Sequence, residues 1–145
     1  RWIDTTPRNV RYANFLHELY PNSKIVHIVR DPRDVAASYL KQAWTPNDYN
    51  WVLEGLRRNY ETLMHIDSRT CATFMKTVRL EDLATNINHE REKLCEFLNI
   101  TIDGFDGSVR FSTASFGRWK SDFDQSTSHK IEGGLNNACH YFGYI

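Results

Sequence analysis

The sequence lacks several features that would place it in a specialised class of protein. No apolar run is long enough to cross a bilayer, and the N-terminus has no apolar signal region. Eighteen Lys and Arg residues balance eighteen Asp and Glu residues, so no global field favours nucleic acid or an anionic membrane surface as a partner. Any anion site must therefore be local. The 145 residues, 41% of them apolar, suffice for one hydrophobic core.

Cysteine is also scarce. Cys71, Cys95 and Cys139 are odd in number, widely spaced and form no CxxC pair. This pattern favours free, mostly buried thiols in a reducing compartment over a disulfide, and so predicts a cytoplasmic protein. The six histidines pair with neither cysteines nor each other at ligand spacing, so we expect no metal site.

The segments that are present alternate between strand-like and helix-like patterns. Residues 24–29 (KIVHIV) are short, β-branched and apolar on both faces, which is typical of a central parallel strand, and 73–79 predict a second strand. Residues 1–3 are a candidate short strand, and 108–128 read as a loop. Helices are expected over 7–20, 34–43, 47–66, 81–86, 88–100 and 128–144, the last weakened by Gly133 and Gly134. The alternation predicts an α/β fold with a parallel sheet flanked by helices.

The strand at 24–29 ends in charge and runs directly into a helix. In an open parallel sheet, ligands bind beyond the carboxyl ends of the strands, where the next helix also directs its free N–H groups. Arg30 offers a planar fork suited to a phosphate, and Ser38 offers a hydroxyl. A helix that begins at Asp34 keeps Ser38 near this point, whereas a helix capped by Asp31 with Pro32 in first position moves Ser38 away.

Two carboxylates in the same turn would repel a phosphate. We therefore expect Asp31 and Asp34 to cap backbone N–H groups or to pair with Arg33 and Arg8. The alternative is a strand–turn–helix unit whose charged turn is merely solvated.

A second basic segment lies late in the chain. Gly117, Arg118, Trp119 and Lys120 place two cations around an indole in a Ser- and Thr-rich stretch. Such a loop can fold over a nucleotide, with the ring shielding the charge contacts from water. The alternative is a tryptophan that anchors a surface loop on the core.

These segments together resemble the sulfotransferases that use 3′-phosphoadenosine 5′-phosphosulfate (PAPS). "KIVHIVRDPRDVAASY" resembles the family's segment that binds the ribose 3′-phosphate, which would assign that role to Arg30 and Ser38. "WIDTTPRN", "KTVRLEDLATN", "FGRWKSDFD" and the final "YFGY" resemble further family elements in the same order, and Gly117, Arg118, Trp119 and Lys120 would close over the 3′-phosphate. The resemblance implies a P-loop-kinase-like sulfotransferase fold, PAPS as donor and PAP (3′-phosphoadenosine 5′-phosphate) as product, with no metal. The resemblance also implies an alternative to the cytoplasm, because sulfotransferases of this kind occur in the Golgi or another secretory lumen as well.

Other parts of the family pattern find no match. No GxxxxGK[ST] or comparable 5′-phosphosulfate loop occurs, and the family carries that loop upstream of "DTTP". We therefore expect residues 1–145 to be a single but partial sulfotransferase domain, incomplete at its N-terminus, whose site is completed by a missing segment or a partner chain. No histidine is a convincing base, and Asp4 is a candidate only if it is not a capping residue, so the catalytic group stays unknown.

The sequence thus predicts a sulfotransferase that moves a sulfuryl group from PAPS to a hydroxyl or amine of a small-molecule, carbohydrate or peptide acceptor. Two alternatives stay open. One is a non-catalytic sulfotransferase-like subunit of an assembly, and the other is a P-loop kinase fragment.

Overall fold

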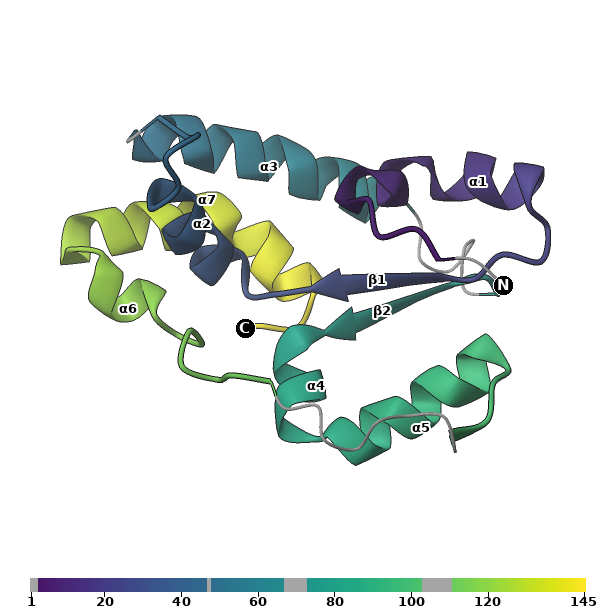
Figure 1. Cartoon of the computed structure of the whole chain (residues 1–145). Helices are drawn as coiled ribbons and strands as arrows, with labels where there is room; N and C mark the ends of the chain where they lie inside the picture. The colour runs from purple at the N-terminus through teal and green to yellow at the C-terminus, as the bar shows by residue number, and fades with distance from the viewer. Residues whose placement is uncertain (1–2, 47, 67–72, 103–110) are drawn as a thin grey trace.

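A computed structural model describes residues 3–46, 48–66, 73–102 and 111–145. The chain begins with the 3₁₀ helix η1 (Pro7–Tyr12) and α1 (Ala13–Leu19). Strand β1 (Ile25–Val29) leads into α2 (Pro32–Leu40) and α3 (Tyr49–His65). Strand β2 (Met75–Arg79) is followed by α4 (Leu80–Thr85), α5 (Ile87–Leu98), α6 (Trp119–Asp122) and α7 (Gln125–Tyr141) (Figure 1).

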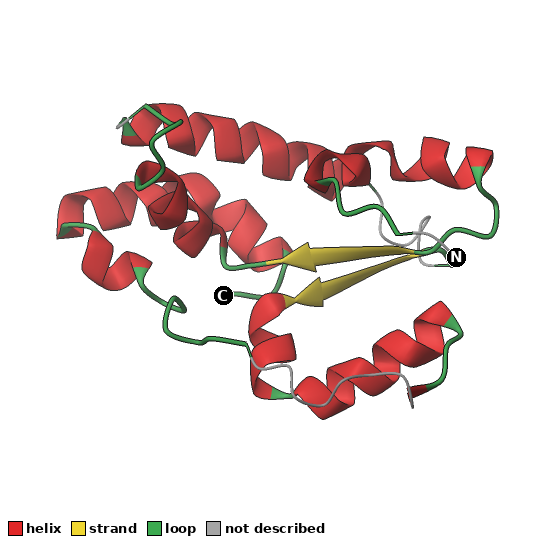
Figure 2. Ribbon diagram, viewed as in Figure 1, coloured by secondary structure: helices red, strands yellow, loops and turns green. Residues whose placement is uncertain are grey.

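The two strands form a parallel sheet, as the sequence predicts. The register runs from Ile25 opposite Met75 to Val29 opposite Arg79, and α2 and α3 lie in the crossover between the strands. His27 packs edge-on against Phe142 at the end of α7, whereas Lys76, on the opposite face, lies over Phe97 of α5. Helices therefore cover both faces of the sheet (Figure 2), and the α/β prediction is confirmed.

The main core lies between α2, α3 and α7. Its buried members come from the end of β1 and from these three helices: Val29, Ala36, Val52, Leu56, Tyr60, Leu63, Ile131, Leu135, Ala138, Cys139 and Phe142. At Gly134 a Cβ would lie 2.8 Å from both Leu53 methyl groups of α3, while at Gly133 it would meet nothing within 4 Å. Gly134 thus lets α3 and α7 approach closely, a role that the expected weakening of this helix did not anticipate.

Several local predictions differ from the structure. The first half of the 7–20 helix is 3₁₀ rather than α, and the supposed loop at 108–128 contains α6 and the start of α7. Ile28 is 56% exposed, so β1 is not buried on both faces as expected. Ile3 lies outside any strand, and Arg1, Trp2 and Cys71 lie outside the described residues. Cys95 and Cys139 are free and buried, as predicted.

Candidate functional site

The turn after β1 is built by Asp31. Its carboxylate caps α2 by accepting from the backbone N–H of Arg33 at 2.9 Å, and it also binds the Arg33 guanidinium at 2.7 Å. The predicted capping and pairing of Asp31 is therefore confirmed. Pro32 takes the first helical position, so of the two helix starts that the sequence allowed, the one that moves Ser38 away is realised. Because Asp31 uses a free N–H itself, the helix N-terminus has less to offer an anion than the sequence suggested.

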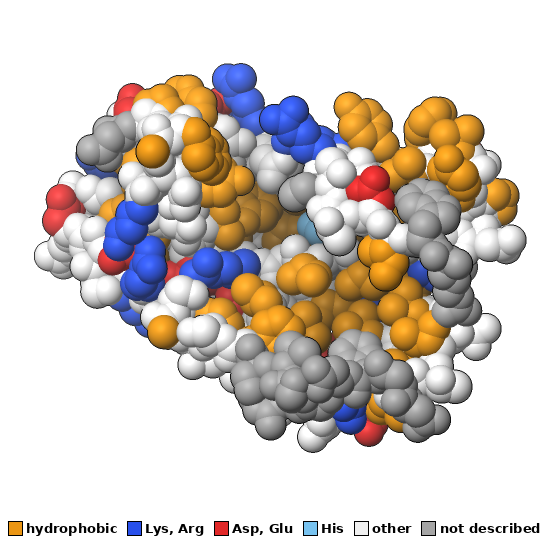
Figure 3. All heavy atoms as spheres, viewed as in Figure 1, with side chains coloured by type: hydrophobic (Ala, Val, Ile, Leu, Met, Phe, Trp, Pro, Cys, Tyr) orange, Lys and Arg blue, Asp and Glu red, His pale blue; other side chains and the backbone are white. Residues whose placement is uncertain are grey.

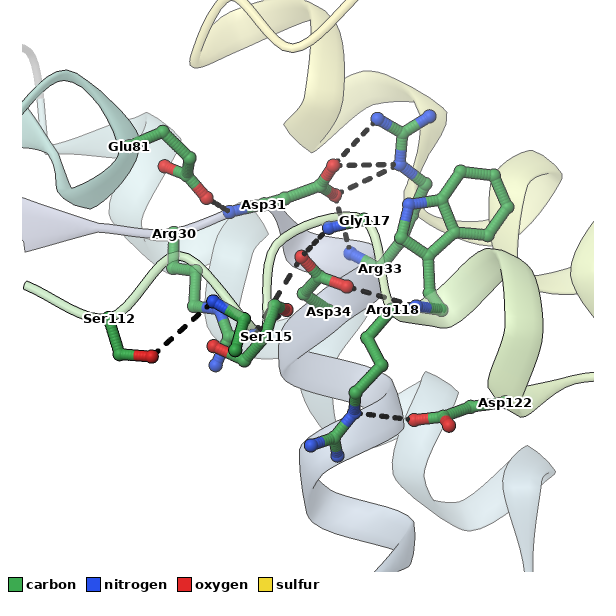
Figure 4. A network of polar contacts seen from close by, with 12 residues as sticks. Arg30, Asp31, Arg33, Asp34, Glu81, Ser112, Ser115, Gly117, Arg118 and Asp122 are labelled. Atoms are coloured by element: carbon green, nitrogen blue, oxygen red, sulfur yellow. Dashed lines mark hydrogen bonds and ion pairs between the residues drawn. The ribbon is translucent and has the colours of Figure 1, made fainter. Parts of the chain in front are cut away.

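Asp34 connects this turn to the late basic segment. Its side chain is 1% exposed and accepts from the backbone N–H of Gly117 at 2.7 Å and of Trp119 at 3.0 Å (Figure 4). Its ion-pair contact is with Arg30, whose Nη2 lies 3.7 Å away. The prediction that Asp34 pairs with Arg33 or Arg8 was wrong, because its partner Arg30 lies four residues earlier and Arg33 pairs with Asp31 instead. Sequence spacing also gave no sign that a segment more than 80 residues later donates its backbone amides to Asp34.

Arg30 lies at the carboxyl end of β1, as expected. Its Nη2 donates to the backbone oxygen of Ser115 at 2.6 Å, which fixes the guanidinium under the loop that precedes α6. Its Nε is buried and finds no hydrogen-bond acceptor within the described parts of the chain. Ser38 is half-buried one helical turn beyond Asp34, so both residues lie on the same face of α2.

Trp119 holds the loop against the body of the protein. The indole is 5% exposed and lies beneath the Arg33 guanidinium, 4.6 Å from the ring centroid, with Lys120 Nζ at 5.7 Å. This burial favours the alternative in which Trp119 anchors a loop on the core over the one in which its ring covers a bound nucleotide. Gly117 takes a left-handed conformation, φ +68°, which glycine adopts without strain.

The two cations of the segment point to different partners. Arg118 Nε donates to Asp122 at 2.8 Å, and Lys41 Nζ contacts the other oxygen of the same carboxylate at 2.8 Å. Hydrogen bonds from Lys41 and then Arg118 lower the pKa of Asp122. Lys120 lines an open groove of about 350 Å³ between α6 and α7, together with Phe123 and Ser128. The structure thus brings Arg30, Gly117 and Trp119 together around Asp34, while Lys120 faces this groove.

Glu81 is a further residue of the site that the sequence did not single out. One carboxylate oxygen accepts the backbone N–H of Asp31 at 3.0 Å, and the other accepts the hydroxyl of Tyr144 at 2.7 Å. Burial, followed by the Glu81 hydrogen bond, raises the pKa of Tyr144. The sequence carries Glu81 and Tyr144 within the "EDL" and final Gly-Tyr elements of the family resemblance, and nothing in the spacing of these elements predicts the pairing.

Asp4 acts as a local capping group. Its Oδ1 accepts from the backbone N–H of Thr6 at 2.7 Å and from the Asn9 side chain at 3.0 Å. The backbone hydrogen bond from Thr6 lowers the pKa of this exposed carboxylate, which makes it a weaker base. These contacts favour the capping role over the catalytic one.

Comparison with known proteins decides the family. The sequence model of a family described as "Sulfotransferase family" matches residues 1–104. This chain belongs to the sulfotransferase family. The sulfotransferase match includes Arg30, Ser38 and Glu81 but ends before Gly117, so the role of the late loop depends on its contacts with Asp34 and Arg30. No curated protein and no solved structure gave a significant match. Within the described ranges, none of the helices has the length and hydropathy required to cross a membrane.

Proposed function

We propose that this sulfotransferase domain binds PAPS and its product PAP, and that it serves the transfer of a sulfuryl group to a hydroxyl or amine. Arg30 carries the proposal. A buried guanidinium N–H without an acceptor is costly, and among the described residues the Nε atoms of Arg30 and Arg79, at the carboxyl ends of the two strands, find none. Arg30 lies where ligands of parallel sheets bind and beneath the late loop. A phosphate would supply further oxygen acceptors to this guanidinium, whose Nη2 already donates to the Ser115 backbone oxygen.

The roles of the neighbouring residues follow from their places. Arg30 would bind the 3′-phosphate, with the loop up to Gly117 lying above the guanidinium. Ser38 would donate from the face of α2 that it shares with Asp34, one helical turn further from the strand end. Arg118 would contribute charge, because its Nε is held by Asp122 while the side chain stays 38% exposed. Trp119 would contribute by anchoring the loop. The bound donor supplies the activated sulfuryl group, and this chain's residues bind and orient it by charge.

The test is protection against thermal unfolding by PAP. At a concentration one hundred times its Kd, a ligand stabilises the folded state by about 2.7 kcal/mol. For a domain of this size, that raises the Tm by roughly 5–10 °C. Arg30→Ala should abolish the shift, whereas Arg58→Ala should not, because Arg58 is 74% exposed and pairs only with Glu54 in the described structure.

Two results would contradict the proposal. Equal protection by 5′-AMP would show that the 3′-phosphate is not recognised, and full protection of Arg30→Ala would remove Arg30 from the site. Neither result depends on knowing the acceptor.

A second candidate is a sulfotransferase-like subunit that binds the nucleotide without transferring its sulfuryl group. Two observations favour it: the capping contacts of Asp4 remove a candidate base, and Trp119 serves to anchor its loop. Labelled PAPS offered with phenols, sugars and peptides separates the candidates, since only the enzyme transfers label.

A further inference from the structure

Three hydrogen bonds within the described residues attach the loop before α6, and Trp119 at the start of α6, to Arg30 and to α2. The Ser115 carbonyl accepts from Arg30, and the amides of Gly117 and Trp119 both donate to Asp34. Figure 4 shows the Asp34 carboxylate lying between α2 and the loop, with Arg30 and Ser115 beside it. Two of the three attachments therefore depend on one side chain.

A carboxylate suits this position because two N–H groups need two acceptor oxygens. Oδ2 serves Gly117 and Oδ1 serves Trp119. An asparagine has only one acceptor oxygen, and its NH₂ group would face the other amide, donor against donor. With the Asp34 side chain 1% exposed, water cannot replace the lost acceptor.

The negative charge of the buried Asp34 carboxylate is stabilised by its neighbours. It receives the two amide hydrogen bonds, sits 3.7 Å from Arg30 Nη2, and occupies the first turn of α2, where the helix dipole favours an anion. A carboxylate so enclosed cannot itself bind a phosphate. It can fix the geometry of the groups that do.

We propose that Asp34 is a positioning residue, which holds residues 115–119 in register with Arg30 so that the guanidinium is presented to the nucleotide. This inference rests on the proposed binding of PAP. The attachment of the loop, by contrast, is a property of the protein without ligand and can be measured separately.

The experiment compares the whole chain with Asp34→Asn, a near-isosteric change. Asp48→Asn is the matched control, because Asp48 also accepts two backbone amides, those of Asn50 and Trp51, as the N-cap of α3. Asparagine caps helices as well as aspartate does, so the control should leave both readouts unchanged. The readouts are hydrogen exchange of the 112–122 segment without ligand and the apparent Kd of PAP from thermal protection.

Asp34→Asn should accelerate exchange of the Gly117 and Trp119 amides by about tenfold or more, and weaken PAP by a similar factor, since about one charge-assisted hydrogen bond is lost. Unchanged exchange, or faster exchange with undiminished PAP affinity, would overturn the inference. If PAP fails to protect the wild type, the proposed function fails instead, whatever the exchange shows.

A second variant covers the case in which Asp34→Asn does not fold. Gly117→Ala removes none of the side chains that hold the loop, and a Cβ there meets no described atom within 4 Å, but it strains a backbone with φ +68°. It should also accelerate loop exchange and weaken PAP. A Gly117→Ala protein that matches the wild type in both readouts would equally refute the inference.

Discussion

Two adjacent glycines in α7 offer a test of the packing that needs no knowledge of function. Gly133 and Gly134 lie in the same helix, and Ala in place of either gains about 1 kcal/mol of helix propensity. They differ in surroundings. A Cβ at Gly133 enters open space, whereas at Gly134 it lies 2.8 Å from both methyl groups of Leu53 and 3.0 Å from its Cγ.

The expected magnitudes follow from these distances. Carbon atoms pack at about 3.5–4.0 Å, so Leu53 must shift by up to about 1 Å to admit Gly134→Ala. Overpacking of this kind costs about 1–3 kcal/mol, which cancels or exceeds the propensity gain. Gly133→Ala should therefore stabilise the protein by about 1 kcal/mol, and Gly134→Ala should fall below it by about 1–3 kcal/mol.

Urea unfolding followed by circular dichroism measures both free energies, and an unchanged m-value keeps the comparison valid. Leu53→Ala provides the internal check, because in that background the two alanine variants should become nearly equal. If Gly134→Ala stabilises the wild-type protein as much as Gly133→Ala does, the Leu53 side chain yields without cost and the predicted overpacking is refuted.

Two further predictions concern the sheet and the chain end. Desolvation lowers the pKa of His27 below its usual value of 6.5, so the unfolded chain binds the proton more readily and the free energy of unfolding should fall as pH drops below about 6.5. Melting curves should show that this dependence of stability on pH is weaker in His27→Gln but retained in His129→Asn. An unchanged pH dependence in His27→Gln would contradict the role of His27. Tyr144→Phe strands one oxygen of Glu81 and should destabilise the protein by about 1 kcal/mol in urea unfolding. Tyr12→Phe, on a ring that is 60% exposed, is the control, and equal losses from both variants would refute the role of Tyr144.

The helices and strands could be predicted well because each depends mainly on its own stretch of sequence, through β-branched runs and amphipathic periodicity. The β-branched run at 25–29 became a strand, and its parallel partner and the amphipathic helices followed at nearly the expected bounds. The sequence allows α2 to start at Pro32 or at Asp34, because both residues suit a first turn, and only the capping by Asp31 decides between them. Gly134 was misjudged because propensity describes an isolated helix and not its contact with Leu53.

The candidate site was only half predictable, for a physical reason. Arg30 could be located because the end of a parallel strand is a known place for ligands, and the family resemblance strengthened that prediction. The partners of Asp34 could not be located, because they are backbone amides 83 and 85 residues away, and every residue type except proline has a backbone amide, so the sequence does not reveal which ones donate. Glu81 contacts Asp31, 50 residues earlier, and Tyr144, 63 residues later, which local patterns could not predict either.

That main-chain attachment has an evolutionary consequence. Since Asp34 binds backbone amides, the other loop side chains can change between relatives without loosening the loop, provided that Gly117 keeps its turn, Trp119 keeps its buried position and no proline removes either donor. The residue that best identifies this attachment in divergent sequences is therefore the aspartate on α2, and a homologue whose loop sequence differs can still have its loop held in the same way.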